Sequence, residues 1–383
     1  MTEPTPAAIR IDLSAIFISL ELSKKTWLVT SISPGSSKMS RYSVPGGDMP
    51  ALLNCLQELR RKAEAREGKS FPVIAIQEAG YDGFWIHRAL EAEDWITSYV
   101  VDAASIAVPR KSRTVKTDRI DGQTLVRTLM ARERGEPRVC SMVRVPTVEE
   151  EDIRRIGRER TVLTREMTRH TNRIKGLLFS VGVRGYKPLR RDRREALETL
   201  RTGDGRLLPV TLKSQISREL DRLELLCAQI EAVCAERDAL CAAVADDKIS
   251  PRAALVALRG IGPEFANVLV SEGLFREFGN RREVAAYAGL APSPWRSGTI
   301  NREQGVSKSG NARLRYTMVE LAWQWVRWQP ETALTRWFVE RVNHSGTRNR
   351  KVAIVALARK LLVALWKYVT AGVVIEGAIM TAA

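Results

Sequence analysis

Residues 101–127 read VDAASIAVPRKSRTVKTDRIDGQTLVR, and the expected fold is organised around this stretch. It begins at the end of an apolar segment and runs into a helical pattern that starts at Asp118. Asp118 and Asp121 stand three residues apart, so a helix puts both carboxylates on one face, with Cβ atoms about 5–6 Å apart. Like charges this close repel each other, and such a pair is tolerated in solvent or around a cation.

Basic residues crowd the same stretch and its continuation. They are Arg110, Lys111, Arg113, Lys116, Arg119, Arg127 and Arg132. Acidic side chains inside a basic field suggest a site for a metal-bound phosphate. The alternative is structural: acids that favour a helix N-terminus, followed by a solvated basic face.

Two further carboxylates follow predicted strands. Residues 16–22 read IFISLEL and predict a buried strand with Glu21 near its end, and residues 71–77 read FPVIAIQ and are followed directly by Glu78. The ends of strands are where an α/β sheet exposes functional groups. Two strand acids that converge on two helix acids suit a pair of Mg²⁺ ions, with Mn²⁺ as a substitute, for phosphoryl transfer.

The pattern up to residue 145 alternates between strand and helix. Strands are expected at 16–22, 27–32, 39–44, 73–77 and 98–101, and helices at 49–66, 83–93 and 118–134. The first three strands lie close together in the sequence, as in an antiparallel meander, and helices separate the later ones. This order predicts a mixed α/β sheet.

Two long helical repeats follow Pro146. Thr147 and Glu150 have the spacing of a capping box, and apolar residues then recur every three or four positions to about residue 177 and again from 212 to 241. The pattern predicts an antiparallel coiled-coil arm joined by the basic segment 182–206. Three cysteines lie seven residues apart on its seam, which favours core packing over reactivity: Cys227, Cys234 and Cys241. The sequence contains no CxxC pair, so a structural zinc site is not expected. Arg160, His170 and Arg237 interrupt the seam.

The chain is strongly basic, with 61 Lys and Arg against 44 Asp and Glu, a formal charge of +17 and a pI near 10.0. This balance indicates a polyanionic partner, most commonly nucleic acid. No apolar run is long enough to span a membrane, and the first residues lack a signal-peptide pattern. A cytoplasmic protein, associated with the nucleoid when bound to DNA, is therefore expected.

Residues 251–383 hold 19 Lys and Arg against nine Glu and no Asp, a net charge of +10. Helices are expected at 281–290, 312–328 and 351–369, with a loop over 291–299. Residues 258–263 (LRGIGP) resemble a helix-hairpin-helix turn that approaches phosphate, and a plain connecting turn explains them equally well. The tryptophans of this region are expected to fill a core or an interface rather than stack on bases.

Several motifs together resemble a known family. They are Ser19–Thr26 (SLELSKKT), Gln77–Gly80 (QEAG), Lys116–Asp121 (KTDRID), Gly260–Pro263 (GIGP), Ala286–Pro292 (AYAGLAP), Ser297-Gly298 and Ser307–Asn311 (SKSGN). In this order they resemble the DEDD-type insertion-sequence transposases of the one-ten family, also described as bridge-RNA-guided recombinases. The resemblance covers roughly residues 16–370.

The resemblance implies an RNase-H/RuvC-like N-terminal fold whose four acidic metal ligands correspond to Glu21, Glu78, Asp118 and Asp121. The family usually has Asp at the first position, so Glu21 lengthens that side chain by one CH₂. The resemblance also implies a nucleophilic serine, which corresponds to Ser297, and strand exchange through a phosphoserine link. From the residues alone, Ser293, Ser307 and Ser309 are rivals, and Ser297-Gly298 is equally an ordinary turn.

The partners implied by the resemblance are element-end and target DNA, a structured bridge RNA, and further copies of the chain, at least a dimer and a tetramer in the synaptic complex. Phosphate contacts are expected from basic residues of both end regions: Lys111, Arg113, Lys116, Arg119, Arg296, Arg302, Lys308, Arg313 and Arg315. Two other functions stay open. One is a RuvC-like nuclease of DNA junctions without a covalent intermediate, and the other is a nucleic-acid-binding protein that has lost catalysis.

The expected division has four parts. A flexible N-terminus (1–13) precedes a RuvC-like domain (14–145), a coiled-coil linker (146–250) and a mainly α-helical transposase domain that carries the serine (251–383).

Overall fold

The computed structural model describes residues 14–36, 38–80, 83–106, 118–136, 139–243, 250–297, 300–345 and 349–381. Within these ranges the side chains of residues 104, 118–120, 241–243, 295–297, 300–303 and 344–345 are not described. The predicted N-terminal segment 1–13 lies outside the described residues. The chain divides into two compact units, Met1–Pro146 and Thr147–Ala383, and the expected four-part division stays a prediction.

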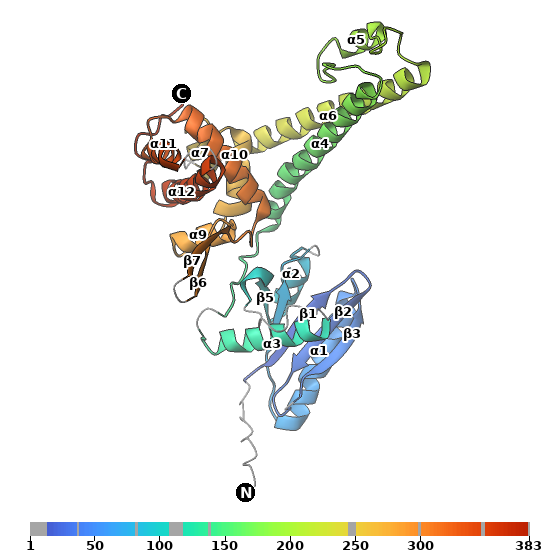
Figure 1. Cartoon of the computed structure of the whole chain (residues 1–383). Coiled ribbons are helices and arrows are strands. Elements are labelled where there is room, and N and C mark those ends of the chain that lie inside the picture. Colours follow the sequence, from blue (N-terminus) through green and yellow to red (C-terminus); the bar gives the residue numbers. More distant parts are fainter. Residues whose placement is uncertain are drawn as a thin grey trace. The chain divides into compact units, whose positions relative to one another are not determined.

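Unit 1 is a five-stranded mixed sheet with helices on both faces (Figure 1). Its elements are β1 (Ile16–Leu22), β2 (Thr26–Ile32), β3 (Ser40–Pro45), α1 (Met49–Glu67), β4 (Val73–Glu78), α2 (Trp85–Glu91), β5 (Ile96–Val101), the 3₁₀ turn η1 (Ala103–Ser105) and α3 (Asp118–Glu133). The strand order is β3-β2-β1-β4-β5. β1 pairs with β2, and β2 with β3, in antiparallel fashion, whereas β1, β4 and β5 are parallel. The mixed α/β prediction is confirmed.

Alternation along the strands separates two cores. Ile16, Ile18 and Leu20 of β1 pack with residues of α1 and α2. On the opposite face, Phe17 packs with Leu125 and with other apolar residues of α3. The α3 face of the sheet is therefore the face to which residues 17, 19 and 21 belong.

Unit 2 begins with two long helices that pack along one another, here called the long-helix pair. They are α4 (Val148–Phe179) and α6 (Val210–Ala243), with the short α5 (Arg193–Thr199) between them at one end (Figure 1). The capping box is confirmed, because the Thr147 side chain accepts from the Glu150 backbone N–H and the Glu150 carboxylate accepts from the Thr147 N–H. Ile174 and Ile216 are buried in the core that the two helices share with α5.

The polar residues that interrupt the seam find partners within the chain. His170 Nδ1 lies 2.5 Å from Oε2 of Glu219, a residue only 3% exposed. Arg160 and Arg237 both pair with Glu264, at 3.3 and 2.8 Å. A buried charge requires such a partner, so these interruptions are internal ion pairs and do not by themselves mark a binding surface.

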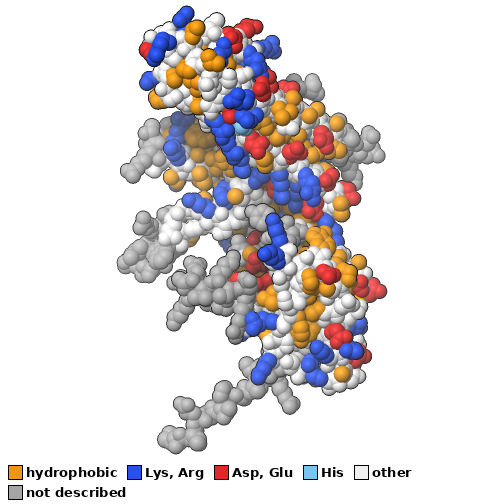
Figure 2. Space-filling model, turned by 90° about the vertical axis from the view of Figure 1, so that its right-hand side faces the viewer, with side chains coloured by type: hydrophobic (Ala, Val, Ile, Leu, Met, Phe, Trp, Pro, Cys, Tyr) orange, Lys and Arg blue, Asp and Glu red, His pale blue; other side chains and the backbone are white. Residues whose placement is uncertain are grey.

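The tip of the long-helix pair, the end that carries α5, exposes several large apolar side chains. Phe179, Leu207 and Val210 are more than half exposed there. Figure 2 shows hydrophobic side chains gathered at this end among basic and acidic ones. None of the helices in the described ranges has the length and hydropathy that crossing a membrane requires.

The rest of unit 2 is mostly helical. It contains α7 (Pro251–Val256), α8 (Pro263–Leu269), a π-helical turn η3 (Val270–Leu274), α9 (Arg281–Tyr287), the hairpin β6 (Pro292–Ser297) and β7 (Ile300–Val306), α10 (Ala312–Trp328), α11 (Ala333–Ser345) and α12 (Arg350–Ala371). Leu357, Leu361 and Trp325 belong to its core and are fully or almost fully buried. The loop predicted over 291–299 is wrong, because most of it is strand β6 paired with β7.

A buried amide is one of the contacts that fasten residues 379–381 to this core, together with backbone hydrogen bonds from Arg259 and to Ala257. Gln329, directly after α10, is fully buried, and its Nε2 donates to the carbonyls of Arg259 and Ile379, both at 2.8 Å. Its Oε1 accepts from the Ile379 backbone N–H at 2.7 Å. One side chain thus ties residue 379 to the turn before α8.

Truncating a core leucine of α12 should be far more damaging than truncating an exposed valine of the same helix. Leu361→Ala removes a fully buried side chain and should lower the free energy of unfolding by about 3 kcal/mol. Val352 is 63% exposed, and Val352→Ala should change it by less than about 0.5 kcal/mol. Urea titration followed by circular dichroism measures both, and equal losses would contradict the packing described for α12.

Candidate active site

Glu21 and Glu78 occupy equivalent places on neighbouring strands. The parallel register of β1 and β4 pairs Leu20 with Gln77, so Glu21 and Glu78 are the next residue of each strand. Ile76, two residues before Glu78, packs in the α3-side core, as Phe17 does four residues before Glu21. Because side chains alternate along a strand, both carboxylates belong to the α3 face of the sheet. Glu78 is exposed and Glu21 is partly buried.

The start of α3 lies against the same part of the sheet. Leu125 and Leu129 of α3 are buried against the sheet. Residues 118 and 121 stand seven and four positions before Leu125, on the same helix face. The Ser19 hydroxyl donates to the Gly122 carbonyl at 2.9 Å. A Cβ built on Gly122 would lie 2.8 Å from Oε1 of Glu21. The Glu21 carboxylate thus touches the residue that follows Asp121.

Part of the predicted acidic set lies outside what the structure describes. Asp118 is the first residue of α3, but its side chain and that of Arg119 are not described, and Lys111, Arg113 and Lys116 lie outside the described residues. Among the described side chains, no group of three or more His, Cys, Asp or Glu residues could hold a metal ion. The four-acid metal site therefore stays a prediction.

One further acid stands at the same edge of the sheet. Asp102 directly follows β5, whose last residue, Val101, pairs with Glu78. It was not predicted from the sequence, although the signal was present, since it comes directly after an apolar strand, as Glu78 was expected to do. Its carbonyl accepts from the backbone N–H and the hydroxyl of Ser105, which anchors η1.

Ser297 is the last residue of β6 and pairs with Ile300 across the hairpin. Gly298 and Thr299 lie outside the described residues, and the side chains of Arg296, Ser297 and Arg302 are not described. The backbone puts Ser297 directly before the turn of a two-stranded hairpin. The predicted roles of these three side chains remain predictions.

Two of the quoted motifs meet at the base of this hairpin. The backbone N–H groups of Ser307 and Asn311 donate to the carbonyls of Ala291 and Tyr287, at 2.8 and 2.7 Å. A Cβ on Gly310 would lie 2.3 Å from the Tyr287 carbonyl oxygen, so only glycine permits this approach. The AYAGLAP and SKSGN motifs therefore pack together, and this pair, here called the motif unit, is the base from which the hairpin extends.

Lys308 lies in this unit with an unusual backbone. Its φ is +58°, which side-chain-bearing residues adopt infrequently. Its N–H donates to the Gly289 carbonyl at 3.2 Å, and its carbonyl accepts from Nη1 of Arg315 at 2.9 Å. The surrounding contacts fix the backbone, while the residue is exposed to solvent.

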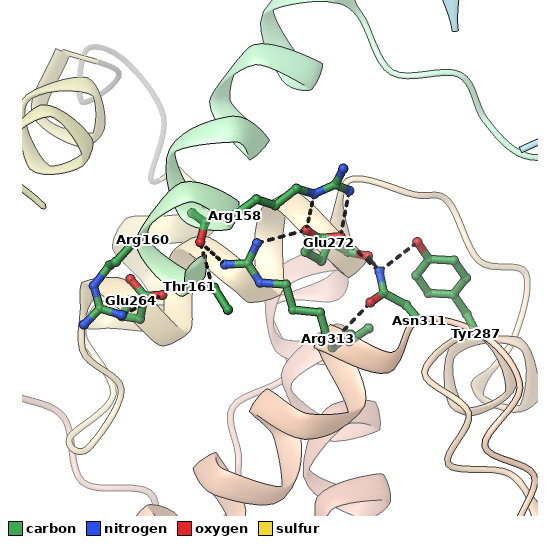
Figure 3. Close-up of polar contacts among 10 residues, drawn as sticks. Arg158, Arg160, Thr161, Glu264, Glu272, Tyr287, Asn311 and Arg313 are labelled. Atoms are coloured by element: carbon green, nitrogen blue, oxygen red, sulfur yellow. Dashed lines mark hydrogen bonds and ion pairs between the residues drawn. The ribbon is translucent and has the colours of Figure 1, made fainter. Parts of the chain in front are cut away.

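A buried carboxylate holds the motif unit to the long-helix pair (Figure 3). Glu272 of η3 is 4% exposed. Its carboxylate accepts from Nε of Arg158 at 3.1 Å, from Nη1 of Arg313 at 3.3 Å and from Nδ2 of Asn311 at 3.1 Å. Arg158 comes from α4, and Asn311 caps α10. Three segments far apart in the sequence are thus joined at one acid, which sequence reasoning did not single out.

The predicted contact of Arg313 with nucleic acid is untested, and the structure gives this residue an internal role. Its Nη2 donates to the Gly157 carbonyl at 2.5 Å, and its Nη1 donates to Glu272. Burial is the largest influence on its pKa and lowers it. For Glu272, burial raises the pKa, but the hydrogen bonds and charge of Arg158, with Asn311 and Arg313, outweigh it, and the net pKa is lowered.

Comparison with known proteins places the chain among transposases. A family model described as "Transposase IS116/IS110/IS902 family" matches residues 252–336. A Sinorhizobium fredii protein described as a transposase, y4rJ, is 63% identical over 98% of this chain and 97% of its own length. A Pseudomonas aeruginosa protein described as a family 20 transposase is 28% identical over 85% of this chain and 92% of its own length. The transposase for insertion sequence element IS1328 of Yersinia enterocolitica is 30% identical over 60% of this chain and 66% of its own length.

Removing the charge of Glu272 should lower the free energy of unfolding of unit 2 by an amount that depends on pH. The folded-state pKa of Glu272 lies below the ordinary value of 4.5, so its contribution to stability is complete above about pH 4.5 and is lost as the pH falls through the folded pKa. At pH 7, Glu272→Gln should lower the free energy of unfolding by about 2 kcal/mol, because Arg313, whose side chain is mostly buried, and the more exposed Arg158 lose the negative charge with which they pair. Urea titrations at pH 7 and pH 3.5 measure this, and the difference should shrink at the lower pH.

Glu340→Gln is the matched control for this change. Glu340 is exposed on α11, and its replacement should shift the stability by less than about 0.5 kcal/mol at either pH. A deficit in Glu272→Gln that stays the same at both pH values would contradict the electrostatic role of Glu272.

Proposed function

The chain belongs to the IS116/IS110/IS902 family of transposases, enzymes that cut and rejoin DNA, and we propose that it does so with an acidic site in unit 1 and a serine nucleophile in unit 2. The observation that carries the proposal is the parallel register of β1 and β4, which sets Glu21 beside Glu78 on the face that α3 covers. The identity of 63% to a relative of nearly the same length supports the transposase function itself.

Unit 1 is proposed to be an RNase-H/RuvC-like domain. Three antiparallel strands followed by two parallel strands, with a helix across the face that carries the strand acids, agree with that fold. Because fold alone does not establish chemistry, the argument for function rests on the acids. Each of Glu21, Glu78 and Asp121 belongs to the α3 side of the sheet near the same strand ends.

The donor set fits a hard divalent cation. Glu21, Glu78, Asp118 and Asp121 offer only carboxylate oxygens, which Mg²⁺ and Mn²⁺ prefer. The Glu21 carboxylate contacts Gly122 and therefore lies next to α3, so its longer side chain stays close to the helix that carries Asp121. Mg²⁺ held by these four residues would supply activation of the attacking oxygen and stabilisation of the leaving oxygen.

Ser297 is proposed to attack a DNA phosphate. Its Oγ gives up its proton and forms a bond to phosphorus, the bond from phosphorus to one sugar oxygen breaks, and that sugar oxygen takes up a proton and becomes a hydroxyl. The phosphoserine bond conserves the energy of the phosphodiester, so the reverse attack by a hydroxyl of another strand rejoins DNA without a cofactor such as ATP. A place at the end of the hairpin that extends from the AYAGLAP and SKSGN motifs, directly before its turn, supports this role.

Nucleic acid is proposed to bind along the basic parts of both units. The residues proposed to contact phosphates are Lys111, Arg113, Lys116, Arg119, Arg296, Arg302, Lys308 and Arg315. A bridge RNA is proposed to select target and donor by base pairing. The long-helix pair is proposed to act as a coiled-coil arm that joins subunits, in at least a dimer and in a tetramer when DNA ends are paired.

Replacing the nucleophile should abolish covalent capture of DNA. Ser297→Ala incubated with element-end DNA, target DNA, bridge RNA and Mg²⁺ should give no protein–DNA adduct on a denaturing gel and no recombinant product. Ser293→Ala, in the same strand, is the matched control and should retain both. An adduct that survives Ser297→Ala would rule out this serine. Cleavage without any adduct in the unmodified protein would favour the nuclease without a covalent intermediate.

Neutralising the helix acid should remove chemistry but not nucleic-acid binding. Asp121→Asn should reduce recombination at least about 100-fold, since stabilisation of the transferred phosphate is lost, while DNA affinity by fluorescence anisotropy stays within a few-fold. Recombination at the normal rate in Asp121→Asn would remove the acidic site from the mechanism. Binding of nucleic acid without any product in the unmodified protein would indicate a chain that has lost catalysis.

A further inference from the structure

At Gly122, α3 lies directly against the sheet. The carbonyl of this residue accepts the Ser19 hydroxyl at 2.9 Å, and the residue directly follows Asp121. Glycine inside a helix costs roughly 1 kcal/mol relative to alanine, because it loses more backbone freedom on folding. A glycine is therefore unfavourable here on helix propensity alone, and its neighbours provide the reason for it.

The missing side chain at Gly122 leaves a space that two groups from the sheet fill. A Cβ at this position would lie 2.8 Å from Oε1 of Glu21, 2.5 Å from Oγ1 of Thr30 and 3.2 Å from Cβ of Thr30. Unbonded carbon atoms prefer about 3.5–4.0 Å, so an added carbon would force the carboxylate, the hydroxyl or the helix to move. Ser19 pairs with Thr30 across β1 and β2, which sets both hydroxyls under α3.

Thr30 presents a buried hydroxyl to this space. It is fully buried, and its Oγ1 has no hydrogen-bond partner among the described residues. A buried polar group without a partner is costly, and it is commonly explained by a function or by a bound species that completes it. The Thr30 hydroxyl and the Glu21 carboxylate thus both lie where a side chain at position 122 would stand.

We infer that Gly122 is a positioning residue: the side chain it lacks leaves a notch that admits the long carboxylate of Glu21 to the acidic site. The inference rests on the proposed function of that site. An aspartate at position 21 is one CH₂ shorter and withdraws from the notch, so an alanine at position 122 would then be obstructed by Thr30 alone. With Thr30 also shortened, glutamate at position 21 requires glycine at position 122, whereas aspartate tolerates alanine there.

A double-mutant cycle of Glu21→Asp and Gly122→Ala tests the pairing. It is run in a Thr30→Ala background as well as in the unmodified one, because Thr30 Oγ1 also obstructs an alanine at position 122. Two quantities are measured on the full chain: the urea midpoint without metal, and the affinity for Mn²⁺ alone by calorimetry. Gly176→Ala is the control, since nothing lies within 4 Å of a Cβ at that helical glycine.

In the Thr30→Ala background, Gly122→Ala should lower the urea midpoint and weaken Mn²⁺ binding about tenfold when residue 21 is Glu. When residue 21 is Asp, the same change should alter affinity less than about twofold and lower the midpoint less, because the remaining close atom is the Cβ of residue 30 at 3.2 Å. Gly176→Ala should leave Mn²⁺ affinity unchanged and raise the midpoint or leave it unchanged.

Equal effects of Gly122→Ala with Glu and with Asp at position 21 would overturn the inference. The failure of the proposed function is recognised separately. If the unmodified protein binds no Mn²⁺, the metal site fails, and the midpoints of the cycle still decide whether Glu21 and Gly122 are sterically coupled.

Discussion

The parallel pairing of β1 with β4 is the constraint from which the arrangement of unit 1 follows. The register that joins Leu20 to Gln77 gives Glu21 and Glu78 the same height in the sheet and the same face. A slip of one residue would turn one of the two carboxylates to the opposite side and would move the apolar residues of its strand out of their core. Burial of those apolar residues therefore fixes the acids as well. The position of α3 depends on the same face, through Leu125 and Leu129.

Unit 2 uses a charged group where unit 1 uses apolar packing. Glu272 lies in a π-helical turn, a local irregularity often found at functional positions. Its carboxylate brings together α4, the cap of α10 and, through Asn311, the motif unit under the hairpin. Fixed hydrogen bonds at one acid define a single arrangement of these segments, which apolar contacts alone do not specify as closely. The hairpin that carries Ser297 thus extends from a base that hydrogen bonds to Glu272 hold in place.

Elements governed by local periodicity could be predicted from the sequence, and contacts between distant segments could not. The strand Ile16–Leu22 and the helix Ala312–Trp328 have the expected bounds because continuous apolar or helical patterns define them. The hairpin was missed because Pro292 and Pro294 are typical of loops. In a two-stranded hairpin each strand has an unpaired edge, where a missing N–H costs little. The Glu272 network joins residues more than 100 positions apart in the sequence, for which no local signal exists. At the candidate site, the motif order indicated Glu21 and Glu78, but the contact with Gly122 required coordinates.

The amide of Gln329 makes the last residues of the chain part of the fold. Its three hydrogen bonds connect Ile379 to the turn at Arg259 across the end of α10. A chain end held in this way belongs to the structure as an internal segment does. Removing residue 379 would leave the buried Oε1 of Gln329 without its donor and would leave its Nε2 with the Arg259 carbonyl alone. An affinity tag or a fused protein is better joined beyond residue 381 through a spacer, so that this anchoring survives.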